Sequence, residues 1–118
     1  MTAPTLSFNV NDVGVIPMPS KKYEGEVASA LLMASKNDWN SFEASWDFQW
    51  FVLLDPDQGA QAGDLLEDAV LHLLEYWNRV SEEQRQREIR NNELVADAYG
   101  VRDDVPCDVP LERVSLKR

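Results

Sequence analysis

The feature that most constrains this fold is a long run of apolar residues at helical spacing in the second half of the chain. Large apolar side chains alternate there at intervals of four and three residues, at Leu66, Val70, Leu73, Trp77 and Val80. This spacing places them on one face of an α-helix. Asp64 is expected to cap the helix, with Glu67 in a capping box, and Gly100 is expected to follow its last turn. The pattern predicts one long helix from Leu65 to about Tyr99.

The middle of this helix is unusually polar. Between Ser81 and Arg90 the only apolar residue is Ile89. A helix that is polar on every face is either exposed to solvent or interrupted. We therefore expect one helix whose middle projects into solvent, with a kink or a frayed turn as the alternative.

The first half of the chain predicts shorter elements. Leu6, Phe8 and Val10 alternate with polar residues, which is the two-residue period of a half-buried strand, and Pro17 ends the pattern. Residues 1–19 are thus expected to form an extended arm. Ser20 is expected to cap a helix that runs from Lys21 to about Ser35.

Residues 38–54 hold the densest aromatic cluster of the chain. Asp38 is expected to cap a short helix, and the run from Trp50 to Leu54 fits either a helix or a strand. We expect the aromatic side chains to lock the short helices of residues 20–54 against the long helix. The predicted structural or interface residues are Trp39, Phe42, Trp46, Trp50, Leu66, Val70, Leu73 and Trp77.

These elements predict a mainly α fold in a single helical module of 118 residues. Its parts are the extended arm of 1–19, the short helices of 20–54, a long helix within 64–100 and an irregular tail at 101–118. A chain of this size buries only about two-thirds of its unfolded surface. We therefore expect a protein partner or self-association, with a symmetric dimer across the long helix as one form of it.

Charge and cysteine content exclude several classes of protein. The net charge of −10 disfavours phosphate binding, which needs clustered Lys and Arg, so we do not expect direct nucleic-acid binding. Cys107 is the only cysteine and cannot form an internal disulfide. The sequence shows no signal peptide and no apolar run long enough to span a membrane. A cytoplasmic location is the resulting expectation.

The inventory of reactive residues predicts no catalytic, cofactor-binding or metal site. His72 is the only histidine, and with Cys107 it makes too small a ligand set for zinc. No nucleophile motif accompanies His72. The five glycines never occur as Gly-X-Gly, so a phosphate-binding loop or dinucleotide fingerprint is not expected. Paired carboxylates such as Asp103 and Asp104 indicate solvated surface.

Three segments resemble one family in order and with compatible spacing. Residues 37–48, NDWNSFEASWDF, resemble a DWxSFExSWDF segment of the large adenine-specific DNA methyltransferases of the BREX phage-resistance type. Residues 92–111, with Ala98-Tyr99-Gly100-Val101 and Val109-Pro110-Leu111, resemble a second segment of that family. Residues 5–17 resemble a stretch just upstream. The resemblance covers nearly the whole chain, and its first motif is the most specific.

The resemblance implies S-adenosylmethionine-dependent adenine-N6 methylation for the full-length family only. Such enzymes hold the flipped adenine with an Asn-Pro-Pro-Tyr motif, and no two prolines are adjacent here. We therefore interpret the chain as a non-catalytic helical connector or scaffold, either a detached fragment or a short stand-alone relative. The alternative is an acidic regulatory or DNA-mimic protein that binds a restriction or modification enzyme. An enzyme of another type is the third hypothesis.

Overall fold

The computed structural model describes residues 9–19, 25–55 and 65–116. Its elements are α1 (Val10–Gly14), α2 (Glu26–Asn40), the 3-10 turn η1 (Val52–Leu54), α3 (Leu66–Tyr99) and the 3-10 turn η2 (Leu111–Arg113). No strand occurs in these ranges. The prediction of a mainly α fold is confirmed.

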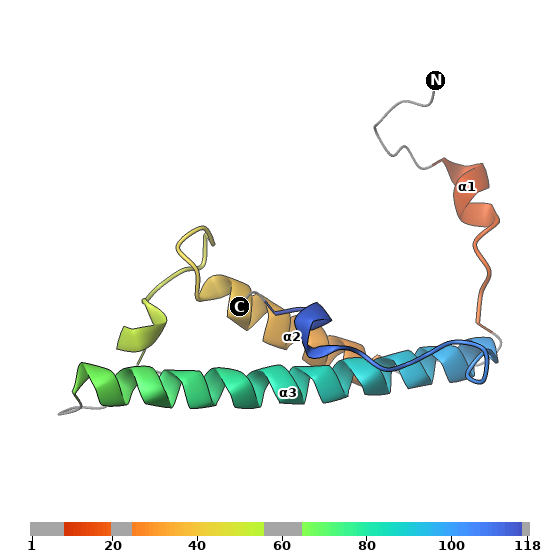
Figure 1. Cartoon of the computed structure of the whole chain (residues 1–118). Coiled ribbons are helices and arrows are strands. Elements are labelled where there is room, and N and C mark those ends of the chain that lie inside the picture. Colours follow the sequence, from red (N-terminus) through yellow and green to blue (C-terminus); the bar gives the residue numbers. More distant parts are fainter. Residues whose placement is uncertain (1–8, 20–24, 56–64, 117–118) are drawn as a thin grey trace, which may run out of the picture.

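Helix α3 is the longest element of the described structure and runs unbroken for 34 residues (Figure 1). At about 1.5 Å per residue it spans roughly 50 Å. It ends at Gly100, which has a φ of 72° and whose N–H donates to the carbonyls of Ala96 and Asp97. Glycine adopts this left-handed conformation without the Cβ clash of other residues, so the helix ends there as predicted. At the other end Leu65 precedes the helix without a side-chain cap, and Asp64 lies outside the described residues.

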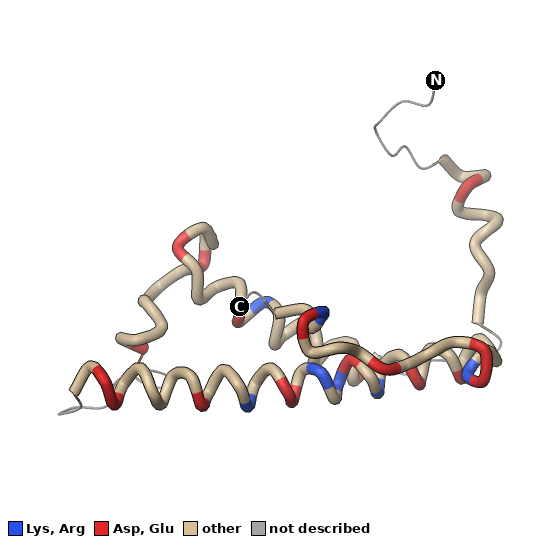
Figure 2. Tube along the Cα trace, viewed as in Figure 1, with Lys and Arg blue, Asp and Glu red and all other residues tan. Residues whose placement is uncertain are grey.

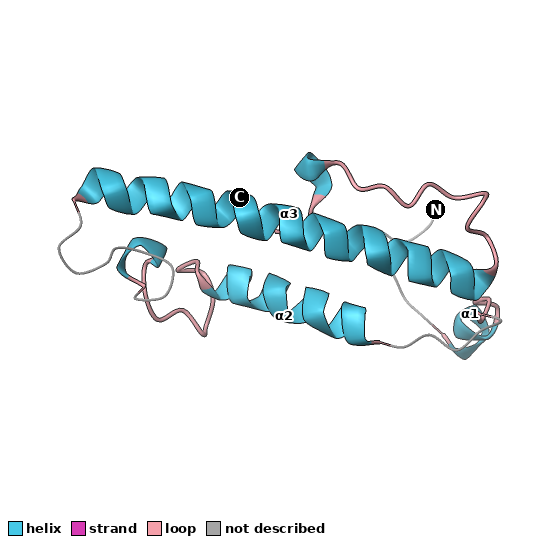
Figure 3. Cartoon of the chain, turned by 90° about the horizontal axis from the view of Figure 1, so that it is seen from below, coloured by secondary structure: helices cyan, strands magenta, loops and turns pink. Residues whose placement is uncertain are grey.

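Helix α2 lies alongside α3 and runs antiparallel to it (Figure 3). Val27, Leu31 and Ala34 form its half-buried face. The helix begins after Gly25 and ends at Asn40, so the predicted end near Ser35 is wrong, while the predicted start at Lys21 lies outside the described residues. Ser41 ends it: its N–H and its hydroxyl both donate to the carbonyl of Asp38, the hydroxyl at 2.6 Å.

Two short-range predictions in the first half are also wrong. Residues 1–8 of the predicted extended arm lie outside the described residues, and within the described part Val10–Gly14 is a helix, because Asn9 and Asp12 form a reciprocal capping box. The expected helix begun by Asp38 is instead a series of turns, because Asp38 already belongs to α2. Phe42, Ser45 and Phe48 each donate a backbone N–H three residues back in these turns. The remaining predicted cap, Ser20, lies outside the described residues.

The tail after Gly100 is irregular, as predicted, and turns back along α3 (Figures 1 and 3). The apolar core is small and consists of Ala69, Leu73, Ala96, Ala98 and Val109. The molecule measures 59 × 36 × 26 Å with a radius of gyration of 19.1 Å. A compact chain of this length would have about 13–14 Å. The elongated shape leaves much apolar surface uncovered.

Within the described ranges, none of the helices is both long enough and apolar enough to cross a membrane.

Candidate protein interface

The predicted structural residues divide into a buried group and an exposed group. Leu73 is only 5% exposed, and Phe42 and Trp77 are half-buried. The others are exposed: Trp39, Trp46, Trp50, Leu66 and Val70. Trp46 has a relative exposure of 102%, so the prediction that it locks a short helix onto α3 is wrong.

The difference in burial between these two groups depends on which face of α3 lies against α2. The buried and half-buried stripe passes through Ala69, Leu73, Trp77, Val80 and Gln84. Val70 and Leu74 lie on a neighbouring, exposed stripe of α3. Leu66 shares the face of Leu73, seven residues later, but it is the first residue of α3 and is exposed. The predicted seam is therefore one helical face that is buried at Leu73 and exposed at Leu66 and Val70.

Gln84 corrects the expectation that the middle of α3 projects into solvent. It has 0% exposure and is the largest fully buried side chain among the described residues. Its Nε2 donates to Ser35 Oγ at 3.3 Å, and Ser35 Oγ donates to the carbonyl of Ser115 at 3.2 Å. Side chains of α2 and α3 and the backbone of the tail thus meet at one point. The Oε1 of Gln84 has no hydrogen-bond partner.

Three other polar residues of α3 bind the tail. Arg85 Nε donates to the carbonyl of Val109 at 2.7 Å, and its guanidinium pairs with Asp108 at 3.1 Å. Glu88 accepts the N–H of Ser115 at 2.7 Å, and Asn92 donates to the carbonyl of Cys107 at 3.2 Å. An irregular segment has backbone groups without partners in regular structure. Polar side chains at intervals of three and four residues on α3 supply those partners.

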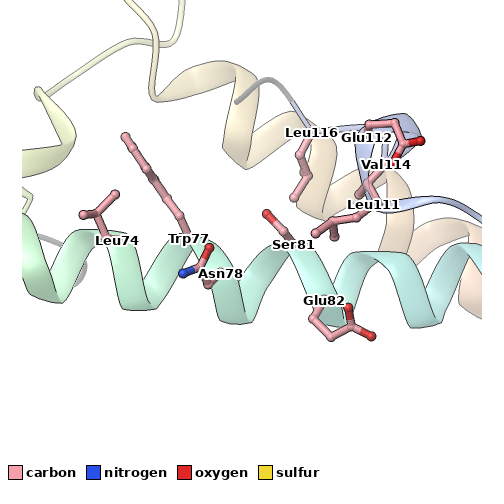
Figure 4. Close-up of a pocket in the computed structure, with 9 residues that line it drawn as sticks. All are labelled: Leu74, Trp77, Asn78, Ser81, Glu82, Leu111, Glu112, Val114 and Leu116. Carbon is pink, nitrogen blue, oxygen red and sulfur yellow. The ribbon is translucent and has the colours of Figure 1, made fainter.

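An open cavity of about 630 Å³ lies where the tail meets α3 (Figure 4). Its lining residues come from both segments: Leu74, Trp77, Asn78, Ser81, Glu82, Leu111, Glu112, Val114 and Leu116. In Figure 4, Leu74 and Trp77 project from α3, and Leu111 and Leu116 come from the tail. Both charged lining residues are carboxylates. Gln86, by a side-chain hydrogen bond, and then Arg85 lower the pKa of Glu82, so it stays ionised at neutral pH.

The cavity opens onto the exposed stripe of α3. We call the surface formed by this cavity and by Leu66, Val70 and Leu74 the apolar groove. The groove is rich in apolar carbon, which suits binding of another apolar surface rather than proton transfer or metal binding. In the part of the chain that the structure describes, no three His, Cys, Asp or Glu side chains are grouped to hold a metal.

A charge signal that surrounds this groove was missed in the sequence. Residues 37–78 contain no Lys or Arg but hold nine carboxylates, all four tryptophans and three of the four phenylalanines. This segment therefore carries −9 of the net charge of −10. Figure 2 shows Asp and Glu, without Lys or Arg, over the amino-terminal third of α3 and the turns that precede it.

Comparison with known proteins identifies the class that the chain resembles. Its relatives are adenine-specific methyltransferases, and no family model and no solved structure matches it. PglX of Lacticaseibacillus casei (strain Zhang) is 26% identical over 125 residues, covering 100% of this chain and 10% of PglX. BrxX of Escherichia coli O9:H4 (strain HS) is 38% identical over 48 residues, covering 41% of this chain and 4% of BrxX. The chain thus spans a tenth or less of the length of these relatives.

Proposed function

We propose that the chain is a non-catalytic connector or scaffold module of an adenine-specific DNA methyltransferase system of the BREX phage-defence type. The observation that carries the proposal is the apolar groove on an unbroken helix of 34 residues. A long rigid helix with uncovered apolar side chains is suited to holding other protein parts at a fixed separation. The similarity to PglX over the whole chain supports a place within such a system.

The packing supports the proposed role of α3 as a rigid spacer. A single helix flanked by solvent gains little stability from its own hydrogen bonds, because most helical stability in proteins comes from tertiary packing. Here α2 covers one flank of α3, and the tail binds another through Arg85, Glu88 and Asn92. The two supports meet at Gln84, near the middle of the helix. In this proposal they keep α3 straight while its amino-terminal half binds the neighbouring part.

The experiment is a methyl-transfer assay on the purified chain. With S-adenosylmethionine and adenine-containing duplex DNA, we expect no methyl transfer and no S-adenosylmethionine binding by calorimetry. Full-length PglX from L. casei serves as the positive control in the same buffer. Measurable turnover by the chain would overturn the proposal.

A further inference from the structure

We propose that the apolar groove binds an amphipathic helix whose apolar face is flanked by Lys and Arg. The inference rests on the proposed function and deepens it, because it names the chemistry of the partner. The groove is the apolar stripe of Leu66, Val70 and Leu74 together with the cavity between α3 and the tail.

The first argument concerns the path of the tail along α3. The tail lies along α3 from Asn92 to Ser81, and its last described residue, Leu116, lines the cavity. Toward the amino end of α3, the described structure leaves Leu66 and Leu74 73% and 47% exposed. Apolar side chains at intervals of four residues make ridges that fit the grooves of a second helix. Binding of an amphipathic helix in an apolar groove is a recurring mode of recognition.

The second argument is charge complementarity. The carboxylates of Glu82 and Glu112 line the cavity, and Glu67 and Glu75 lie on the exposed side of the same part of α3. Among the described cations near the cavity, Arg85 pairs with Glu82 and Asp108, and Arg113 lies beside Glu112 in η2. The unbalanced negative charge therefore lies over the amino-terminal part of α3, where residues 37–78 contain no Lys or Arg. A partner that brings Lys and Arg to the rim of the groove is attracted, whereas an acidic partner is repelled.

The same charges argue against a second copy of this chain as the occupant. A symmetric contact through the groove would set two segments of charge −9 against each other. A cationic helix avoids this repulsion.

The test uses the full chain and two designed peptides. Both peptides have leucines at positions i, i+4 and i+7, and one has Lys at the flanking positions where the other has Glu. We expect the lysine peptide to bind, by calorimetry, and to bind more weakly as salt is raised. Leu74→Ser should weaken this binding tenfold or more. Leu32→Ser is the matched control, because Leu32 is 70% exposed on α2 and outside the groove, and it should leave binding unchanged.

Three peptide-binding results would overturn the inference. They are equal binding of the two peptides, equal binding by the Leu74→Ser chain with its helical circular dichroism intact, and no peptide binding at all. Sedimentation showing a dimer that Leu74→Ser dissociates would assign the groove to a second copy and overturn it too. None of these outcomes bears on methyl transfer, so failure of this inference is distinguishable from failure of the proposed function.

Discussion

Leu73→Ala should lower the free energy of unfolding by about 2–5 kcal/mol, the usual cost of truncating a buried leucine. Leu73 is the largest buried aliphatic side chain of this small core, and the core has little else to fill the resulting cavity. Because small domains are stable by only about 5–15 kcal/mol, this loss should be a large part of the total. Urea unfolding followed by circular dichroism measures it.

The adjacent residue provides the control. Leu74 is on the exposed stripe of α3 and buries far less surface, so Leu74→Ala should cost less than about 1 kcal/mol. Equal destabilisation by the two substitutions would contradict the distinction between the buried stripe and the apolar groove.

Arg85→Ala should release the tail from α3 while the helix itself remains. The substitution removes the hydrogen bond to the carbonyl of Val109 and the ion pair with Asp108. Val109 is buried, so its carbonyl would lose a charged donor without easy access to water. Hydrogen bonds to charged groups contribute about 1.5–3 kcal/mol. Native-state hydrogen exchange should show lost protection at residues 113–116 and retained protection in the middle of α3.

Arg87→Ala is the matched control for this prediction. Arg87 pairs with Glu83 one turn earlier on the same helix, and no ion pair joins it to the tail among the described residues. Such pairs contribute about 0.2–0.5 kcal/mol. If the Arg87 variant lost tail protection as fully as the Arg85 variant, the tail would not be held as described.

The long helix could be predicted because its signals are local. Apolar spacing over several turns and a glycine after the last turn define its end at Gly100 without knowledge of any other segment. The mainly α fold follows from the same periodicity. The capping box of Asn9 and Asp12 is also local, but the alternation at Leu6, Phe8 and Val10 favours a strand over the same stretch.

The polar middle of α3 could not be interpreted from the sequence alone. Gln84 and Arg85 are indistinguishable in the sequence from solvent-exposed residues, yet they bind α2 and the tail. The hydroxyl of Ser35, which accepts from Gln84, lies 49 positions away, and the carbonyl of Val109, which accepts from Arg85, lies 24 positions away, and neither group carries a hydrophobic signal. Tertiary contacts therefore decided burial where periodicity indicated exposure.

The candidate interface was predicted in part. The sequence predicts Trp46, Trp50, Leu66 and Val70 as structural or interface residues, and the full exposure of Trp46 contradicts its expected packing against the body of the protein. That any of them contacts a partner stays a prediction. The segregation of charge over residues 37–78 could have been read from the sequence. The side of α3 that the tail leaves uncovered could not be predicted from the sequence, because it depends on the path of an irregular segment.

The most direct test of the central claim is methylation by L. casei PglX with the matching helix interrupted. Proline at the position aligned with Gln84 breaks a helix at a cost of about 3 kcal/mol or more, and alanine there is the control. The connector account predicts that the proline variant binds S-adenosylmethionine as the parent does but methylates DNA at least tenfold more slowly. The alanine variant should stay within about twofold of the parent. Parental methylation by the proline variant, or loss of S-adenosylmethionine binding along with it, would contradict the account.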